Sequence, residues 1–170
     1  TDNDGSFKFQ VGDGEKFSKT EYETEINVNA VNDTFSINAE DTTPINIDGG
    51  AGYDTVKLEG NSNIDFSKLE DISIKNIEAI DLKEGDHALT NIKLEDVLKM
   101  TDSNKELIIL GDENDKVTFK DSVDADGNEQ TWSKTEGTNE DTGFDIYANS
   151  GDESLKVKVE QPIISDGITS

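Results

Sequence analysis

The sequence predicts an all-β fold, either a β-sandwich or a β-roll, with one or two short helices. Segments in which apolar and polar residues alternate outnumber segments with helical spacing, and Tyr22–Val31 and Leu155–Val159 are examples. Turn residues interrupt the chain at short intervals. The apolar runs Ile77–Leu82 and Leu107–Leu110 are typical of buried strands. A continuous parallel β-helix is less expected, because the chain's glycine-rich nonapeptide does not repeat in tandem.

The composition excludes several functions. The chain has 170 residues and a net charge of −24, from 39 acidic residues against 15 basic ones, all of them lysine. Such a surface repels nucleic-acid phosphates and anionic membranes. Hydrophobic residues make up only 31% of the chain, so we expect the folded state to need divalent cations that offset the repulsion between acids. The absence of Cys excludes disulfides and thiolate metal sites.

The first 33 residues read as strands and turns. Asp2-Asn3-Asp4-Gly5 is a D-x-D-G turn, in which Asp2 and Asp4 are candidate calcium ligands or members of an Asx turn. The end of this segment, VNAVND through Asp33, resembles the last strands of cadherin-like and immunoglobulin-like repeats of bacterial surface proteins. Thr34-Phe35 stands where those repeats have Ala-Pro. Residues 1–33 are therefore either the terminal strands of a preceding repeat or an edge hairpin of the main domain.

The stretch Ile47–Leu58, IDGGAGYDTVKL, contains a calcium nonapeptide of the form G-G-x-G-x-D-x-U. Its glycines allow a tight turn that points carbonyl oxygens at one ion, Asp54 adds a carboxylate, and Val56 points into a core. Calcium accepts about six to eight oxygens in irregular geometry, and Asp48 is a further candidate ligand. One nonapeptide supplies about half a site, because neighbouring turns of such solenoids share each ion. The alternative is a glycine-rich hairpin with solvated acids.

One helix is expected after this turn. The apolar residues of Leu94–Met100 follow i, i+3, i+4 spacing, which predicts a short amphipathic helix. Ser67-Lys68-Leu69-Glu70 is a capping-box pattern that would start one helical turn. The remaining apolar segments up to Leu110 are predicted strands.

Two more acidic turns follow. Gly111–Val117 repeats the order of the first turn, with a glycine, an acid, a later acid and a β-branched residue. Asp124–Glu129 has a D-x-D-G-N pattern that places alternate oxygens around one ion, as an EF-hand loop does, without the downstream Glu or the flanking helices. The alternatives are an acidic hairpin turn and a solvated loop. The candidate calcium ligands in these turns are Asp112, Asp115, Asp124, Asp126 and Asn128.

Trp132, the single Trp, lies just after these turns. It is either a core anchor or a wall for a bound ligand. Residues 162–170 have the character of a linker, so the main domain is expected to span residues 34–161.

From Ile47 to Val159 the order of features is specific: DGGAGYDTVKL, IDFSKLEDISIKNIEAIDL, LEDVLKMTD, LGDENDKVTF, a Trp and DIYANSG. This order resembles a module of the giant repeats-in-toxin (RTX) adhesins that bacterial type I systems secrete. Phe66-Ser67 replaces a Leu-Ser of that pattern, and Lys93 stands in place of a helix-capping Ser. The resemblance implies a ligand-binding domain at the bacterial cell surface, a monomer within a long tandem-domain chain. Some related modules take peptide ends through calcium.

The expected function is therefore calcium-dependent adhesion, with a peptide or glycan on a host or microbial cell surface as partner and no membrane insertion. The alternative is a calcium-rigidified spacer of the same adhesin. An enzyme is not expected, because His87 is the single histidine, Cys is absent and no carboxylate pair stands out. The expected ligand-binding residues are Asp112, Asp115, Asp124, Asp126 and Trp132.

Overall fold

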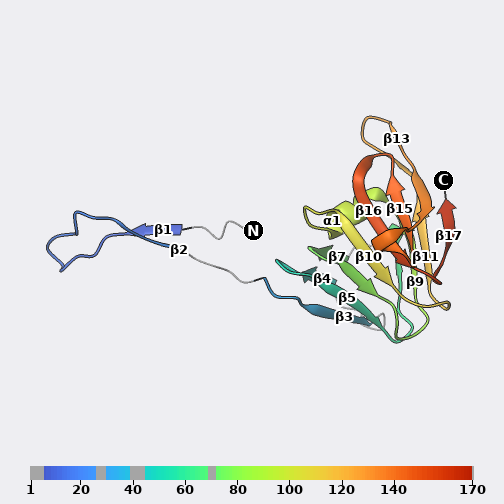
Figure 1. The fold of residues 1–170 in the computed structure, drawn as a ribbon, viewed down its shortest axis with the longest axis horizontal. Helices are drawn as coiled ribbons and strands as arrows, with labels where there is room; N and C mark the ends of the chain where they lie inside the picture. The colour runs from blue at the N-terminus through green and yellow to red at the C-terminus, as the bar shows by residue number, and fades with distance from the viewer. Residues whose placement is uncertain (1–5, 26–29, 39–44, 69–71, 170) are drawn as a thin grey trace. The chain divides into compact units, whose positions relative to one another are not determined.

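The structure, a computed structural model, describes residues 6–25, 30–38, 45–68 and 72–169. The chain forms two compact units, Thr1–Ala30 and Val31–Ser170. In the first unit, strand β1 (Ser6–Phe9) pairs antiparallel with β2 (Tyr22–Glu25) (Figure 1). Asp2 and Asp4, the first candidate ligands, lie outside the described residues.

The second unit is built mainly from parallel strands (Figure 1). One sheet joins, in parallel pairs, β3 (Thr34–Asn38), β5 (Thr55–Glu59), β8 (Ala79–Asp81), β10 (Glu106–Leu110) and β16 (Asp152–Glu160). A second sheet joins β6 (Asn63–Asp65), β9 (Ala88–Ile92), β11 (Lys116–Lys120) and β17 (Ile164–Thr169). A short third sheet pairs β4 (Ile45–Asp48) with β7 (Ile72–Lys75), and helix α1 (Leu94–Met100) contacts β7.

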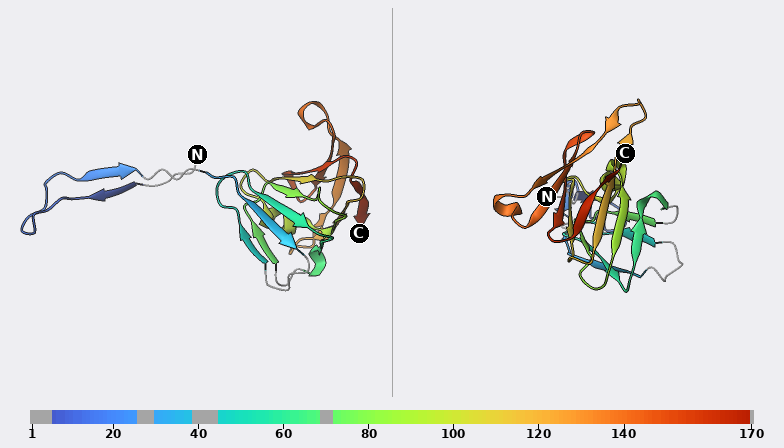
Figure 2. Two further views of the ribbon diagram at one scale, coloured as in Figure 1. Left: turned by 90° about the horizontal axis from the view of Figure 1, so that it is seen from below. Right: turned by 90° about the vertical axis from the view of Figure 1, so that its right-hand side faces the viewer.

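Successive strands from β3 to β11 belong to different sheets, so the chain winds from sheet to sheet (Figure 2). Each turn of this winding stacks on the turn before it through pairs of parallel strands. Thr34 pairs with Thr55, and Thr55 pairs with Ala79. The all-β prediction is confirmed, and the parallel winding is that of a roll. This parallel winding is a solenoid arrangement, which was less expected from the sequence because the nonapeptide does not repeat in tandem. A tandem repeat of the nonapeptide is not needed for winding, because each turn pairs with the next through backbone hydrogen bonds, which do not depend on a repeated motif.

Antiparallel hairpins extend this body near its C-terminal end. β14 (Trp132–Glu136) pairs with β15 (Phe144–Asn149), and β15 pairs with β16, which widens the first sheet. The short hairpin β12 (Ser122–Val123) and β13 (Glu129–Gln130) carries the third acidic turn, and a 3-10 turn, η2 (Asn139–Asp141), lies between β14 and β15.

The core fills the space inside the winding. Burial alternates along the strands, so that Leu107 and Ile109 of β10 point inward, as do Val117 and Phe119 of β11. Each such side chain contributes roughly 1.5–3 kcal/mol by leaving water. Trp132 belongs to this core: it is 5% exposed, and its ring lies 4.7 Å from that of Phe119. The structure thus places Trp132 as a core anchor rather than as a wall open to a ligand.

Helix α1 spans the predicted residues Leu94–Met100. Without a capping Ser at Lys93, the Asp96 side chain accepts the Lys93 amide at 2.9 Å and so caps the first turn. The predicted helical turn near Ser67 is the short 3-10 turn η1 (Phe66–Lys68). The predicted linker at residues 162–170 differs from the structure, because Ile164–Thr169 form β17 beside β11. The buried side chains of Ile163 and Ser165 explain why this segment pairs.

Candidate cation site at the glycine turn

The glycine turn connects β4 to β5 and is held at its start by Asp48. The Asp48 Oδ1 atom accepts the Gly50 amide at 3.2 Å and the Asn76 side-chain amide at 2.6 Å. The Gly49 amide donates to the Lys75 carbonyl at 3.0 Å. The turn is therefore tied to the chain that leaves β7, one winding further on.

Asp54 ends the turn and is fully buried, which excludes the alternative of a solvated acid at this position. It points inward, in step with Val56 and Leu58 of β5. Its Oδ1 atom accepts the Asp33 amide at 2.7 Å. Its Oδ2 atom is buried and has no hydrogen-bond partner among the described residues.

The unpartnered oxygen faces the bare α-carbon of Gly49. A Cβ placed on Gly49 would lie 2.6 Å from Asp54 Oδ2 and 2.2 Å from the Asn76 carbonyl oxygen. Asp54 Oδ2 and the Asn76 carbonyl oxygen therefore both lie close to Gly49, at a position where no side chain fits.

Glu78 occupies the same register position one winding later, directly before β8. Its Oε2 atom accepts the Asp54 amide at 2.6 Å. Burial raises the pKa of Glu78, and the charges of Asp102 and Asp54 act in the same direction. Among the described residues, neither Asp54 nor Glu78 forms an ion pair. Two neighbouring carboxylates thus lack a counter-charge, which favours uptake of a cation.

The second acidic turn, Gly111–Val117, also places a buried acid directly before a strand, but both carboxylate oxygens of this acid have hydrogen-bond partners. Asp115 is fully buried directly before β11, and burial raises its pKa. Its Oδ1 atom accepts the His87 amide at 2.9 Å, and its Oδ2 atom accepts the Asp112 amide at 2.8 Å. Asp112 in turn accepts the Asn114 amide at 2.8 Å. The structure gives Asp115 a role in joining two windings.

The third acidic turn, Asp124–Glu129, is held by hydrogen bonds between its own residues. Asp124 accepts the amides of Asp126 and Asn128 and the side-chain amide of Asn128, at 2.8–2.9 Å. The bonds from Asn128 are the main cause of a lowered pKa of Asp124. Within the described ranges, no hydrogen bond joins this loop to the Asp112–Asp115 turn. That the five residues expected to bind a ligand share one site therefore stays a prediction, and Trp132 is buried.

Glu78 and the Asn76 carbonyl were not among the candidate ligands predicted from the sequence, although Glu78 stands out as an acid inside an apolar strand segment. The signal that could have found Glu78 is its position, because it directly precedes an inward-alternating strand, as Asp33 and Asp54 do. In the part of the chain that the structure describes, no three acidic or histidine side chains gather closely enough to hold a metal by themselves. A cation at the glycine turn would therefore depend on carbonyl oxygens as well.

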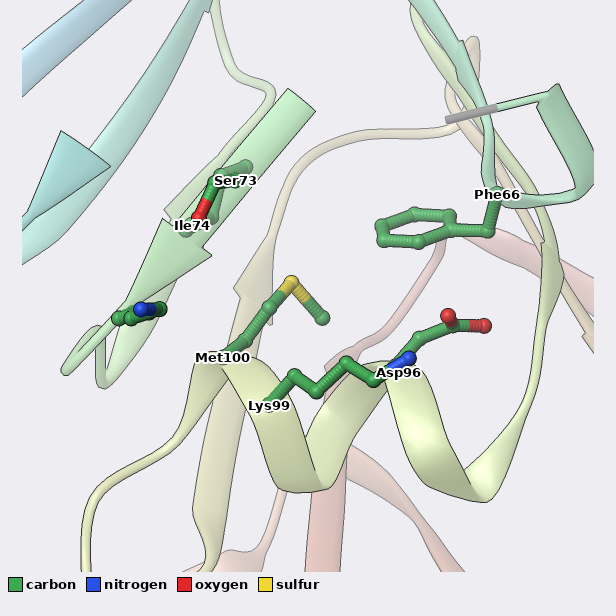
Figure 3. Close-up of a pocket in the computed structure, with 7 residues that line it drawn as sticks. Phe66, Ser73, Ile74, Asp96, Lys99 and Met100 are labelled. Atoms are coloured by element: carbon green, nitrogen blue, oxygen red, sulfur yellow. The ribbon is translucent and has the colours of Figure 1, made fainter. Parts of the chain in front are cut away.

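A separate hollow of about 160 Å³ lies between α1, β7 and η1 (Figure 3). Phe66, Ile74 and Met100 form its apolar walls, with Asp96 and Lys99 of the helix at its side. Among the described residues that line this hollow, Asp96 is the single acid, and its carboxylate caps the helix. Over the described residues, no helix is long and apolar enough to cross a membrane.

Comparison of the chain with protein-family models, with curated proteins and with solved structures found no match.

Proposed function

We propose that the second unit is a calcium-dependent module of a secreted bacterial adhesin, with its calcium at the glycine turn. One observation carries the calcium assignment: Asp54 Oδ2 is a fully buried carboxylate oxygen without a hydrogen-bond partner among the described residues. A buried oxygen left bare costs folding free energy, whereas a bound cation would satisfy it. The Asn76 carbonyl lies beside the same glycine, Gly49, and the Glu78 carboxylate accepts the Asp54 amide, so both are further candidate ligands.

Calcium suits this set of donors better than other common metals. It binds carboxylate and carbonyl oxygens in irregular geometry, whereas magnesium demands a near-ideal octahedron. The absence of Cys removes the soft ligands that zinc and copper prefer. When bound, calcium would supply the positive charge that Asp54 and Glu78 lack, and it would lessen the self-repulsion of a chain with net charge −24.

The test is thermal unfolding of the whole chain in chelator and in millimolar calcium. Free calcium at about 100 times Kd stabilises the fold by about 2.7 kcal/mol. Asp54→Asn keeps Oδ1 for the Asp33 amide and replaces Oδ2 with an amide group, which cations do not bind. We expect this variant to fold in chelator and to lose the calcium-dependent rise in melting temperature.

Asp115→Asn is the matched control, because Asp115 is equally buried but both of its oxygens already accept amides. This variant should be less stable in both solutions and should keep the calcium-dependent rise. Equal melting temperatures of the parent in chelator and in calcium would refute the calcium assignment.

The adhesive role is supported by the resemblance to RTX modules and by Tyr53, which is 43% exposed beside Asp54 in the glycine turn. A bound ion next to an exposed ring would hold an acidic or hydroxyl-rich group of a peptide or glycan. The test is a screen of short peptides and glycans against the folded chain, with and without calcium. Binding that disappears in chelator supports adhesion.

A calcium-rigidified spacer is the second candidate, and one observation favours it. The residues expected to bind a ligand are engaged within the fold, since Asp115 and Asp124 accept backbone amides and Trp132 is buried. A calcium-loaded chain that binds no ligand in the screen and no cell surface would establish the spacer instead.

A further inference from the structure

Residues Val31–Asp33, here named the strap, lie along the glycine turn at the start of the second unit. Four hydrogen bonds fasten the strap: Val31 N to Ala51 O at 3.0 Å, Tyr53 N to Asn32 Oδ1 at 3.0 Å, Asp33 N to Asp54 Oδ1 at 2.7 Å, and Thr55 N to Asp33 O at 2.9 Å. Three of these bonds join backbone or side-chain amide groups, and the fourth uses the buried carboxylate. The strap therefore contacts the same residue whose other oxygen has no partner.

Gly52 shows how closely the strap approaches the turn. Its φ is +153°, and a Cβ at this position would lie 2.1 Å from the Val31 carbonyl oxygen. No side chain fits there while the strap is bound. The last glycine of the nonapeptide therefore serves the strap as well as the turn.

The Asp54 carboxylate links the strap to the candidate cation site. Oδ1 accepts the strap amide of Asp33, and Oδ2 is the unpartnered oxygen beside Gly49. Because the two oxygens belong to one planar group, a bond that fixes one of them also orients the other. The strap amide thus sets the direction in which Oδ2 is presented.

We propose that the strap is a positioning element of the cation site, so that calcium binding at Asp54 and docking of Val31–Asp33 strengthen each other. This inference rests on the proposed function. Coupling between two sites is reciprocal in binding free energy. Calcium would then fix the segment through which the chain enters the second unit, and loss of the strap would weaken calcium binding.

The experiment uses the whole chain. Amide hydrogen exchange of Val31 and Asp33, followed by NMR, should slow by about tenfold when calcium is added, which lies within the usual range of coupling between sites. Gly52→Ala places a methyl group against the Val31 carbonyl and leaves every candidate ligand in place. It should raise the calcium concentration at half-saturation by about tenfold, as expected for loss of one hydrogen bond to a charged group.

Gly127→Ala is the control for backbone strain. Gly127 also has positive φ, +86°, but a methyl group added to it would have no atom within 4 Å, and it lies in the β12–β13 loop. This variant should leave calcium binding unchanged. Asn32→Ala is a milder second variant, since it removes only the acceptor of the Tyr53 amide. It should weaken calcium binding in the same direction as Gly52→Ala without straining the backbone.

The two proposals fail in different ways. If the parent chain does not bind calcium, the proposed function is wrong and the coupling falls with it. If the parent binds calcium but the Val31 and Asp33 amides exchange at the same rate in both solutions, the coupling alone is refuted. Calcium affinities of Gly52→Ala and Asn32→Ala equal to that of the parent would also refute it.

Discussion

Asp115→Ala should destabilise the fold strongly, and the loss should be the same with and without calcium. The Asp115 carboxylate is fully buried and accepts the His87 amide at 2.9 Å and the Asp112 amide at 2.8 Å. Alanine leaves both amides without an acceptor, at roughly 1–3 kcal/mol for each buried donor. Removal of a buried charge returns part of this cost, because burial raises the pKa of Asp115. We therefore expect the free energy of unfolding to fall by about 2–4 kcal/mol.

Urea unfolding in chelator measures this loss, with the fluorescence of the single, buried Trp132 as the signal. Asp126→Ala is the control, because Asp126 is an exposed acid of the β12–β13 loop. A surface change of this kind should alter stability by less than about 0.5 kcal/mol. A loss below about 1 kcal/mol for Asp115→Ala would show that the two amides find other acceptors, and the role assigned to Asp115 would be wrong.

Three further predictions follow from other parts of the structure. Phe119→Ala removes a fully buried ring that packs against the rings of Trp132 and Tyr147, so urea unfolding should show a loss of about 3–5 kcal/mol. Gly49→Ala should abolish the calcium-dependent rise in melting temperature, because its methyl group would lie 2.6 Å from Asp54 Oδ2; an unchanged rise would place the ion elsewhere. Burial raises the pKa of Asp96 in the folded chain, so the contribution of Asp96 to stability falls as the pH rises above its pKa in the unfolded chain. Lys105 lowers the pKa of Asp152 to about 2, so the contribution of Asp152 to stability falls as the pH drops below its pKa in the unfolded chain. The melting temperature in chelator should therefore be highest at about pH 4, the unfolded value of an Asp pKa, and a steady rise to pH 8 would contradict these shifts.

Local pattern was sufficient for many elements of this chain. Alternation of apolar residues marked the strands, and i, i+3, i+4 spacing gave the bounds of α1 at Leu94–Met100. Pattern reports which face of a segment is buried, but it does not report which segment covers that face. The parallel winding depends on partners 21 and 24 residues apart, such as Asp33 with Asp54 and Asp54 with Glu78. The same limit hid β17, because its strand character depends on β11 being beside it.

The two buried acids show what only the tertiary structure decided. In the sequence, Asp54 and Asp115 both follow a glycine turn and precede a β-branched residue that begins an inward-alternating strand. The sequence by itself therefore determined that both are special positions in acidic turns. Among the described residues, the folded chain brings two amides to the carboxylate of Asp115 and one to that of Asp54. A carboxylate with both oxygens satisfied holds two windings together, whereas one with a bare, buried oxygen requires a further partner, and that difference arises from neighbours that are distant in the sequence.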